Sequence, residues 1–351
     1  MFHRRLAKGT GKPQVRTKNR IRNAINRKIL FIILILLVLG AAALTILSGS
    51  VAIPALDVLS ILAGDEVTNP AWTYIIWQMR IPATLTAMLT GAALSVAGLL
   101  LQSYFRNPLA GPSILGITSG SHLAVAITIL LLGTPPGFGL VIAAFFGALL
   151  ILLILLGLGG IVRQPVTLLI VGILLSYLSN AVLTLLSYSA SADGIQALML
   201  WGMGSFNQVG MAQMPLFASL ILASLTASCW LIKPLNGWML GDLYARNLGV
   251  SIPGVRWGVL MVTGLLCAVT TAWCGPIAFI GLSIPHVARM MFRTDNHRIL
   301  LPASLLLGSL CALICLWLSS MPSNGRTLPI NALTQLFGIP VILYVLLRRK
   351  S

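Results

Sequence analysis

The chain has 351 residues, of which 58% are hydrophobic and only 8% are charged, and its mean hydropathy is +0.97. A water-soluble domain of this length carries roughly 25% charged residues, so the composition excludes one. Apolar stretches of about 20 residues recur, each long enough to cross a hydrocarbon core of roughly 30 Å. Because these stretches are continuous rather than alternating, a β-barrel is disfavoured. We predict an all-α, polytopic helical membrane protein.

Residues 1–28 form a basic tail that contains 10 of the 23 Lys and Arg residues and no acidic residue. Nucleic-acid binding is one interpretation of such a tail. A cytosolic tail beside anionic membrane lipid is the preferred one, because cations concentrate on the cytosolic side of membrane proteins. The apolar stretch that follows is long enough to remain a span, so we expect neither a cleaved signal peptide nor a nucleic-acid partner.

Hydropathy and length together predict about ten transmembrane helices. With the basic tail in the cytosol, 21 Lys and Arg residues fall on the cytosolic side, and only Arg80 and Arg326 fall outside. This asymmetry places both termini in the cytosol. The predicted spans are 29–48, 82–103, 114–133, 138–160, 166–187, 213–232, 257–274, 277–292, 299–318 and 330–347.

Two outer segments do more than connect spans. Residues 49–80 contain ALDVLSILAG, which predicts a short surface helix, and residues 188–212 contain DGIQALMLWGMGSF, which predicts an interfacial or re-entrant helix. The second span carries the small-residue pattern GAALSVAG at 91–98. Small residues one turn apart let helices approach closely, and ordinary helix packing is our default interpretation of them.

The acidic residues narrow the function. All six lie in predicted loops and none in a predicted span, whereas ion-coupled transporters usually need intramembrane carboxylates. The chain has no GxxxxGK[ST] phosphate-binding loop, so a second subunit must bind any ATP that drives it. No span carries an HExxH motif, paired acids or a Ser-His set, and the five cysteines form no CxxC. We expect no enzyme activity, no metal site and no cofactor.

The longest cytosolic segment is 233–256, KPLNGWMLGDLYARNLGVSIPGVR. Turn signals stand at both of its ends, and two short amphipathic pieces lie between them. A plain connector does not need that pattern. A pair of short helices that presents a partly apolar face to a cytosolic partner does.

Three stretches resemble one known family: RIPATLTAMLTGAALSVAGLLLQSYFRNPLAGPSILGITSG (80–120), LNGWMLGDLYARNLGVSI (235–252) and GPIAFIGLSIPHVAR (275–289). The family is the FecCD-like permeases of type II ATP-binding-cassette importers for iron-siderophores, haem and vitamin B12. The resemblance covers roughly residues 29–348. It implies a ten-helix permease domain over 29–348 in the bacterial cytoplasmic membrane. It also implies two cytosolic ATPase subunits and a periplasmic or lipid-anchored binding protein. The second permease subunit would form a homodimer or a pseudo-symmetric heterodimer, and the homodimer is our default.

The resemblance assigns roles to residues by position. In the segment 233–256, the residues that would couple the permease to the ATPase are Gly241, Asp242, Ala245, Leu248 and Gly249. The cytoplasmic gate would include Asn107 and Leu109 of the NPL sequence, and Pro165 and Val166 at the start of the fifth span.

Outer arginines of the family pair with acids on the binding protein, and Arg80 matches the first of two. Ala83 stands where the second is expected. Near the C-terminus, Ser319 or Ser320 replaces an Asp and Thr327 replaces a Glu, with Arg326 in a shifted Arg position. Rim charges mainly affect encounter rate and register, so these departures concern docking rather than fold.

The function expected from the resemblance is inward transport of an iron complex, either a ferric siderophore or haem, by alternating access. Import of vitamin B12 or cobinamide by the same family is the alternative, and an ion-coupled secondary transporter is disfavoured. Pathway residues of this family are mostly small and apolar, so the sequence does not identify the ligand.

Overall fold

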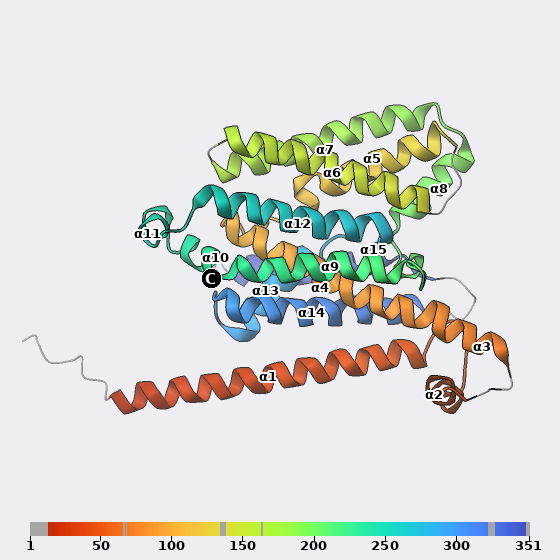
Figure 1. The fold of residues 1–351 in the computed structure, drawn as a ribbon, viewed down its shortest axis with the longest axis horizontal. Coiled ribbons are helices and arrows are strands. Elements are labelled where there is room, and N and C mark those ends of the chain that lie inside the picture. Colours follow the sequence, from red (N-terminus) through yellow and green to blue (C-terminus); the bar gives the residue numbers. More distant parts are fainter. Residues whose placement is uncertain are drawn as a thin grey trace, which may run out of the picture.

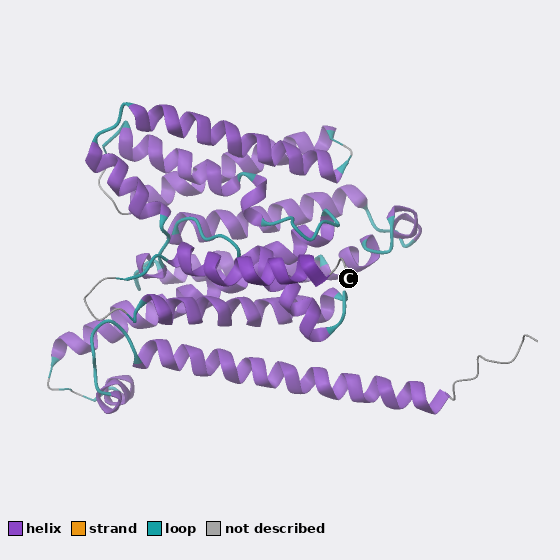
Figure 2. Ribbon diagram, turned by 180° about the vertical axis from the view of Figure 1, so that it is seen from behind, coloured by secondary structure: helices purple, strands orange, loops and turns teal. Residues whose placement is uncertain are grey.

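The computed structural model describes residues 13–65, 67, 69–133, 138–162, 164–321 and 327–348. Every regular element in these ranges is a helix (Figure 2), which confirms the all-α prediction. The α-helices are α1 (Pro13–Leu47), α2 (Ala55–Ala63), α3 (Pro70–Tyr74), α4 (Ile81–Tyr104), α5 (Ile117–Leu130), α6 (Phe138–Ile161), α7 (Pro165–Tyr188), α8 (Ala192–Gly202), α9 (Met214–Trp230), α10 (Ile232–Trp238), α11 (Asp242–Asn247), α12 (Ile252–Cys274), α13 (Ile280–Phe292), α14 (His297–Ser319) and α15 (Ile330–Arg348). Shorter turns are the π-helix η1 (Ile75–Arg80) and the 3-10 helices η2 (Pro112–Leu115) and η3 (Phe206–Gln208).

The long helices run side by side in a bundle, and the short helices cap its two ends (Figure 1). Helices α10 and α11 lie at one end, where α1 begins, while α2, α3 and α8 lie at the other. The charge asymmetry identifies the end with α10 and α11 as the cytosolic one. Helices α5, α6 and α7 form a layer on one side of α12, and α1 lies on the far side of α14.

Six of the described helices are long and apolar enough to cross a membrane. Helices α9 and α10 form a further candidate that is bent by 47°. The other predicted spans correspond to the shorter apolar helices α5 and α15 and to the 13-residue α13. The membrane architecture is therefore as predicted, whereas the count of ten spans stays a prediction.

The second span extends further outward than the sequence suggested. Helical structure is continuous from Pro70 through η1 to Tyr104, so the end of the expected outer loop 49–80 is helical. Asn69 starts it by accepting a hydrogen bond from the Ala71 N–H at 3.0 Å. The π-helical turn ends at Arg80, just before Pro82, whose ring and missing N–H disturb α-helical bonding in the preceding turn. The predicted outer helix is confirmed as α2.

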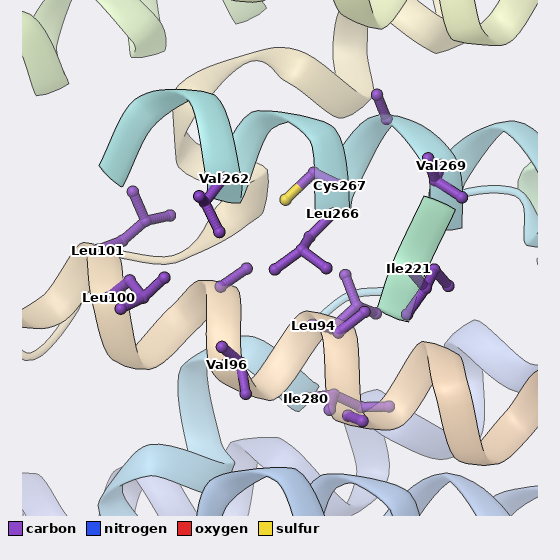
Figure 3. Close-up of a cluster of buried hydrophobic side chains, with 14 of the residues drawn as sticks. Leu94, Val96, Leu100, Leu101, Ile221, Val262, Leu266, Cys267, Val269 and Ile280 are labelled. Atoms are coloured by element: carbon purple, nitrogen blue, oxygen red, sulfur yellow. The ribbon is translucent and has the colours of Figure 1, made fainter. Parts of the chain in front are cut away.

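Helix α4 is the centre of the bundle and is buried along nearly its whole length. Its apolar side chains meet those of α9, α12 and α13 in one core (Figure 3). Two glycines of the pattern 91–98 make the closest approaches: a methyl group on Gly91 would overlap the Gly308 carbonyl of α14, and one on Gly98 would overlap the Gly281 carbonyl of α13. The small residues therefore serve close helix packing, as the default interpretation held.

Candidate coupling segment and cytoplasmic gate

The segment after α9 forms the predicted pair of short helices, α10 and α11. Two glycines determine where α11 begins and ends. Gly241 has a φ of 109° before the helix and Gly249 has a φ of 74° after it, a region that side chains rarely occupy. After α11, the Val250 N–H donates to the Ala245 carbonyl at 2.9 Å, which closes the helix end.

The other coupling residues divide into anchors and an exposed position. Ala245 is fully buried and anchors α11. Asp242 forms an ion pair with Arg106 of its own chain at 2.9 Å, although its side chain is 58% exposed. Leu248 is 63% exposed. The predicted coupling residues therefore lie together, although only Leu248 offers a large apolar side chain to a partner.

Three further side chains join Leu248 in an exposed apolar group, here called the apolar tip: Leu240, Leu243, Tyr244 and Leu248. Leu243 is 79% exposed and Tyr244 is 67% exposed. Both belong to α11, which lies at the cytosolic end of the bundle (Figure 1). Large apolar groups exposed on the aqueous side of a protein mark interaction surfaces. Sequence reasoning recognised the amphipathic pattern here but did not assign Leu243 or Tyr244 to the site.

The NPL turn (Asn107–Leu109) follows the cytosolic end of α4. The Asn107 side-chain oxygen accepts a hydrogen bond from the Leu109 N–H at 2.9 Å, so this side chain shapes the turn. Leu109 is 41% exposed. His286 of α13 contacts the Pro108 carbonyl through Nε2 at 2.8 Å and fixes the turn from the other side.

The second predicted gate element is the start of α7. Pro165 occupies the first turn of the helix, and Val166 is 57% exposed. The two gate elements are connected through η2, which follows the NPL turn and packs on α7. Gly172 permits that contact, because a methyl group there would meet the Leu115 backbone at 2.9 Å.

The structure describes one of the two predicted docking arginines, Arg80, and not the other, Arg326. The side chain of Arg80 is buried and donates hydrogen bonds to the carbonyls of Ile46 at 2.7 Å, Leu47 at 3.1 Å and Val51 at 2.5 Å. Arg80 thus holds the outer end of α1 in place. The sequence predicted an exposed docking residue and not this structural role. Arg326 lies outside the described residues, and docking by either arginine stays a prediction.

The replaced family charges also lie in ordinary structural environments. Ala83, where a second arginine was expected, is buried inside the bundle. Ser319 is buried at the end of α14 and donates to the Leu328 carbonyl at 2.6 Å. A charge at either position would need to leave the protein interior, because an isolated buried charge is costly.

Comparisons with known proteins agree with this architecture. The FecCD transport family model matches residues 32–348. The vitamin B12 import system permease protein BtuC of Klebsiella pneumoniae is 36% identical over 303 residues, which are 84% of this chain and 90% of that protein. BtuC of Salmonella typhimurium is 35% identical over 310 residues, which are 86% and 94% of the two chains.

A solved structure described as a metal-chelate type ABC transporter, in an inward-facing conformation, superposes with a TM-score of 0.81. It is 29% identical in sequence, and the match covers 92% of this chain and all of the other. The family match, the curated relatives and this structure agree over the same bundle. The chain therefore belongs to the FecCD transport family and is an ABC importer permease of the bacterial inner membrane.

Proposed function

We propose that this permease moves a bulky metal chelate into the cell, driven by separate ATPase subunits that bind its apolar tip. The observation that carries the proposal is the exposure of Leu243, Tyr244 and Leu248 on a helix that two glycines and buried Ala245 hold in place. An apolar face on a short, anchored helix fits a groove on a folded partner. Two ATPase subunits would bind a homodimer symmetrically.

One face of α7 supports a pathway between two copies of the chain. Tyr177, Asn180, Thr184 and Tyr188 follow the spacing of a single helix face, and all are exposed. An amide exposed to hydrocarbon is costly, so polar residues within spans usually face another protein surface or a water-filled cavity. Val166 lies on this same face. A pathway lined by α7 of both copies therefore leads to the predicted gate.

The ligand class follows from the relatives, and two members of it compete. From the sequence we expected an iron complex, whereas the two BtuC relatives are named for vitamin B12 and the structural relative for a metal chelate. Ferric siderophores, haem and corrinoids are all bulky metal chelates. We infer that the binding protein, which delivers the ligand, selects among them.

The test is uptake into proteoliposomes that contain the permease, its ATPase and its binding protein. Radiolabelled cobalamin, a ferric siderophore and haem are offered separately, with ATP inside. ATP-dependent accumulation of one of them supports the proposal and names the ligand. Failure of all three, with a binding protein shown to bind one of them, would contradict it.

Variants of the apolar tip test the coupling role separately. Leu243→Arg and Leu248→Arg place a charge on the proposed ATPase contact, and we expect the ATPase to be lost during purification. Leu243→Met retains the apolar surface and serves as the matched control. Retention of the ATPase by both arginine variants, with normal ligand-stimulated hydrolysis, would assign ATPase binding to another surface.

A further inference from the structure

Arg106 joins the NPL turn to the coupling segment by three contacts. Its guanidinium donates a hydrogen bond to the Trp238 carbonyl at 2.6 Å, lies 4.3 Å from the centre of the Trp238 ring, and pairs with Asp242 at 2.9 Å. Trp238 ends α10 and Asp242 begins α11. Arg106 itself directly precedes Asn107, so one side chain touches both short helices while its backbone leads into the turn.

The backbone of Arg106 reinforces this connection. Its φ is 48°, a left-handed conformation that is uncommon for a residue other than glycine. The neighbouring Tyr104 carbonyl accepts a hydrogen bond from the Trp238 indole N–H at 2.9 Å. The chain thus leaves α4 in a conformation that directs the arginine side chain back over α10, and the contacts with Trp238 offset the cost of that conformation.

Arg256 makes the corresponding connection to the second gate element. It donates to the Tyr104 hydroxyl at 3.0 Å through Nε and to the carbonyls of Gly159 and Val162 through Nη1. Gly159 lies in the last turn of α6 and Val162 directly follows the helix, and α7 starts three residues later at Pro165. Because the Tyr104 ring also stacks on Trp238, with centroids 5.9 Å apart, Arg256 is linked to the same tryptophan as Arg106.

We propose that Arg106 and Arg256 are positioning residues that transmit movement of α10 and α11 to the two gate elements separately. Arg106 carries it from Trp238 and Asp242 to the NPL turn, and Arg256 carries it from the Tyr104–Trp238 stack to the end of α6, which precedes α7. This inference rests on the proposed function, since it presupposes that an ATPase moves the short helices. It adds the residues through which that movement reaches Leu109 and Val166.

The contacts of Arg106 are suited to rearrangement. The side chains of Arg106 and Asp242 are 38% and 58% exposed, and exposed ion pairs contribute little to stability. The bond to the Trp238 carbonyl and the contact with its ring are the stronger pair. A connection of this kind can shift with α10 without unfolding the end of α4, which distinguishes it from a core contact.

The experiment measures how fast a maleimide labels a cysteine at each gate element, in the complete complex with its ATPase, with ADP and with trapped ATP. Leu109→Cys reports on the NPL turn and Val166→Cys on the start of α7, since both native side chains are exposed. Labelling of the native cysteines, among which Cys229 is exposed, is measured on the chain without these substitutions and subtracted.

Each reporter is combined with two positioning variants. Arg106→Asn is chosen because Asn tolerates a positive φ, and Arg256→Gln keeps a side-chain donor without the charge. Arg106→Lys, which retains the cation, and Arg298→Ala, which removes an exposed arginine at the start of α14, serve as controls.

We expect nucleotide-dependent labelling to fall about tenfold at residue 109 in Arg106→Asn, because a charged hydrogen bond and a cation–π contact are lost together. Residue 166 should keep more of its response than residue 109 in that variant, because Arg256 still connects the end of α6 to the Tyr104–Trp238 stack. Arg256→Gln should show the reverse pattern, Arg106→Lys should restore much of the response, and Arg298→Ala should change nothing. Each variant thus contains an internal control for folding.

Three results would count against the inference or its basis. Unchanged responses in both variants, with nucleotide-dependent labelling in the parent chain, would overturn the inference and leave the proposed function intact. Equal loss at both reporters in either variant would show a general structural role and also overturn it. If Arg256→Gln fails to bind the ATPase, the same labelling comparison is made with Arg256→Lys. If labelling of Leu109→Cys and Val166→Cys without a positioning variant is the same with ADP and with trapped ATP, that result would contradict the proposed function itself.

Discussion

The indole N–H of Trp238 donates a hydrogen bond to the Tyr104 carbonyl at 2.9 Å, and the rings of the two residues stack against each other. This relationship binds the end of the central helix α4 to α10, although 134 positions separate the two residues in sequence. Trp238 is 3% exposed. The cytosolic end of the bundle is therefore an ordered polar and aromatic structure rather than a set of loose loops.

Replacing Trp238 should separate the contribution of its ring from that of its hydrogen bond. Trp238→Ala should lower the free energy of unfolding by about 3–5 kcal/mol, the range for loss of a buried tryptophan. Trp238→Phe retains most of the ring and should cost about 1–3 kcal/mol, because the Tyr104 carbonyl loses its donor. Thermal unfolding of the purified protein in detergent checks the order. Equal effects of the two variants would contradict the role of the ring.

Close helix crossing predicts an unusual sensitivity to a single methyl group. Gly98→Ala should destabilise the bundle by about 1–3 kcal/mol or more, because the methyl group overlaps backbone of α13 rather than a side chain that can move. Gly157→Ala is the matched control, since its position on α6 is open. The control should be neutral or slightly stabilising, as alanine favours helix. Comparable melting temperatures for the two variants would refute the crossing.

Because the guanidinium of Arg80 is buried, we predict that replacing Arg80 lowers the stability of the protein, whether or not it also affects docking of the binding protein. Arg80→Ala removes three hydrogen bonds to the end of α1 and the turn after it, and should cost about 2–4 kcal/mol. Protease sensitivity of the outer segment and the melting temperature measure this loss. Arg298→Ala is the control for removing an arginine. A variant with normal stability but weakened affinity for the binding protein would instead support the docking role expected from the resemblance.

The exposed side chain of Leu109 predicts a leak. We propose that the two NPL turns meet in a dimer and close the exit. Leu109→Ala would then leave a gap, and ligand should escape from loaded proteoliposomes without nucleotide. We expect an efflux rate several times that of the parent chain. Leu347→Ala, an exposed leucine on α15, is a control that removes the same side chain elsewhere. Unchanged efflux would leave the turn with only its structural role.

Much of this architecture follows from one-dimensional patterns. Hydropathy gives the long helices, charge asymmetry gives the orientation, and the amphipathic stretch 233–256 predicts the helix pair α10 and α11. Arg80 shows what such patterns do not predict. Its place between an outer segment and a span predicted an exposed cation, but its side chain is buried and donates to the carbonyls of Ile46 and Val51, which are distant in sequence. The outward extension of the second span depended likewise on a cap at Asn69 and a π-helical turn.

The location of the candidate site could be predicted from the sequence, whereas the contacts between its residues and other segments could not. Gly241, Asp242 and Leu248 were placed on one segment by resemblance, and the structure keeps them together. The partners Arg106, Trp238 and Arg256 were not assigned to the site, because their contacts join segments 132 and 97 positions apart. Such long-range polar contacts leave no periodic signal, whereas the exposed Leu243 and Tyr244 did follow the amphipathic pattern.

In the proposed function, ATP hydrolysis on separate subunits drives import through this permease. The most direct measurement is ligand uptake by proteoliposomes that contain the full complex, with vanadate and a protonophore added in separate samples. We predict that vanadate abolishes uptake and that the protonophore leaves it unchanged. Uptake that persists with vanadate and collapses with the protonophore would contradict the claim and identify an ion-coupled transporter instead.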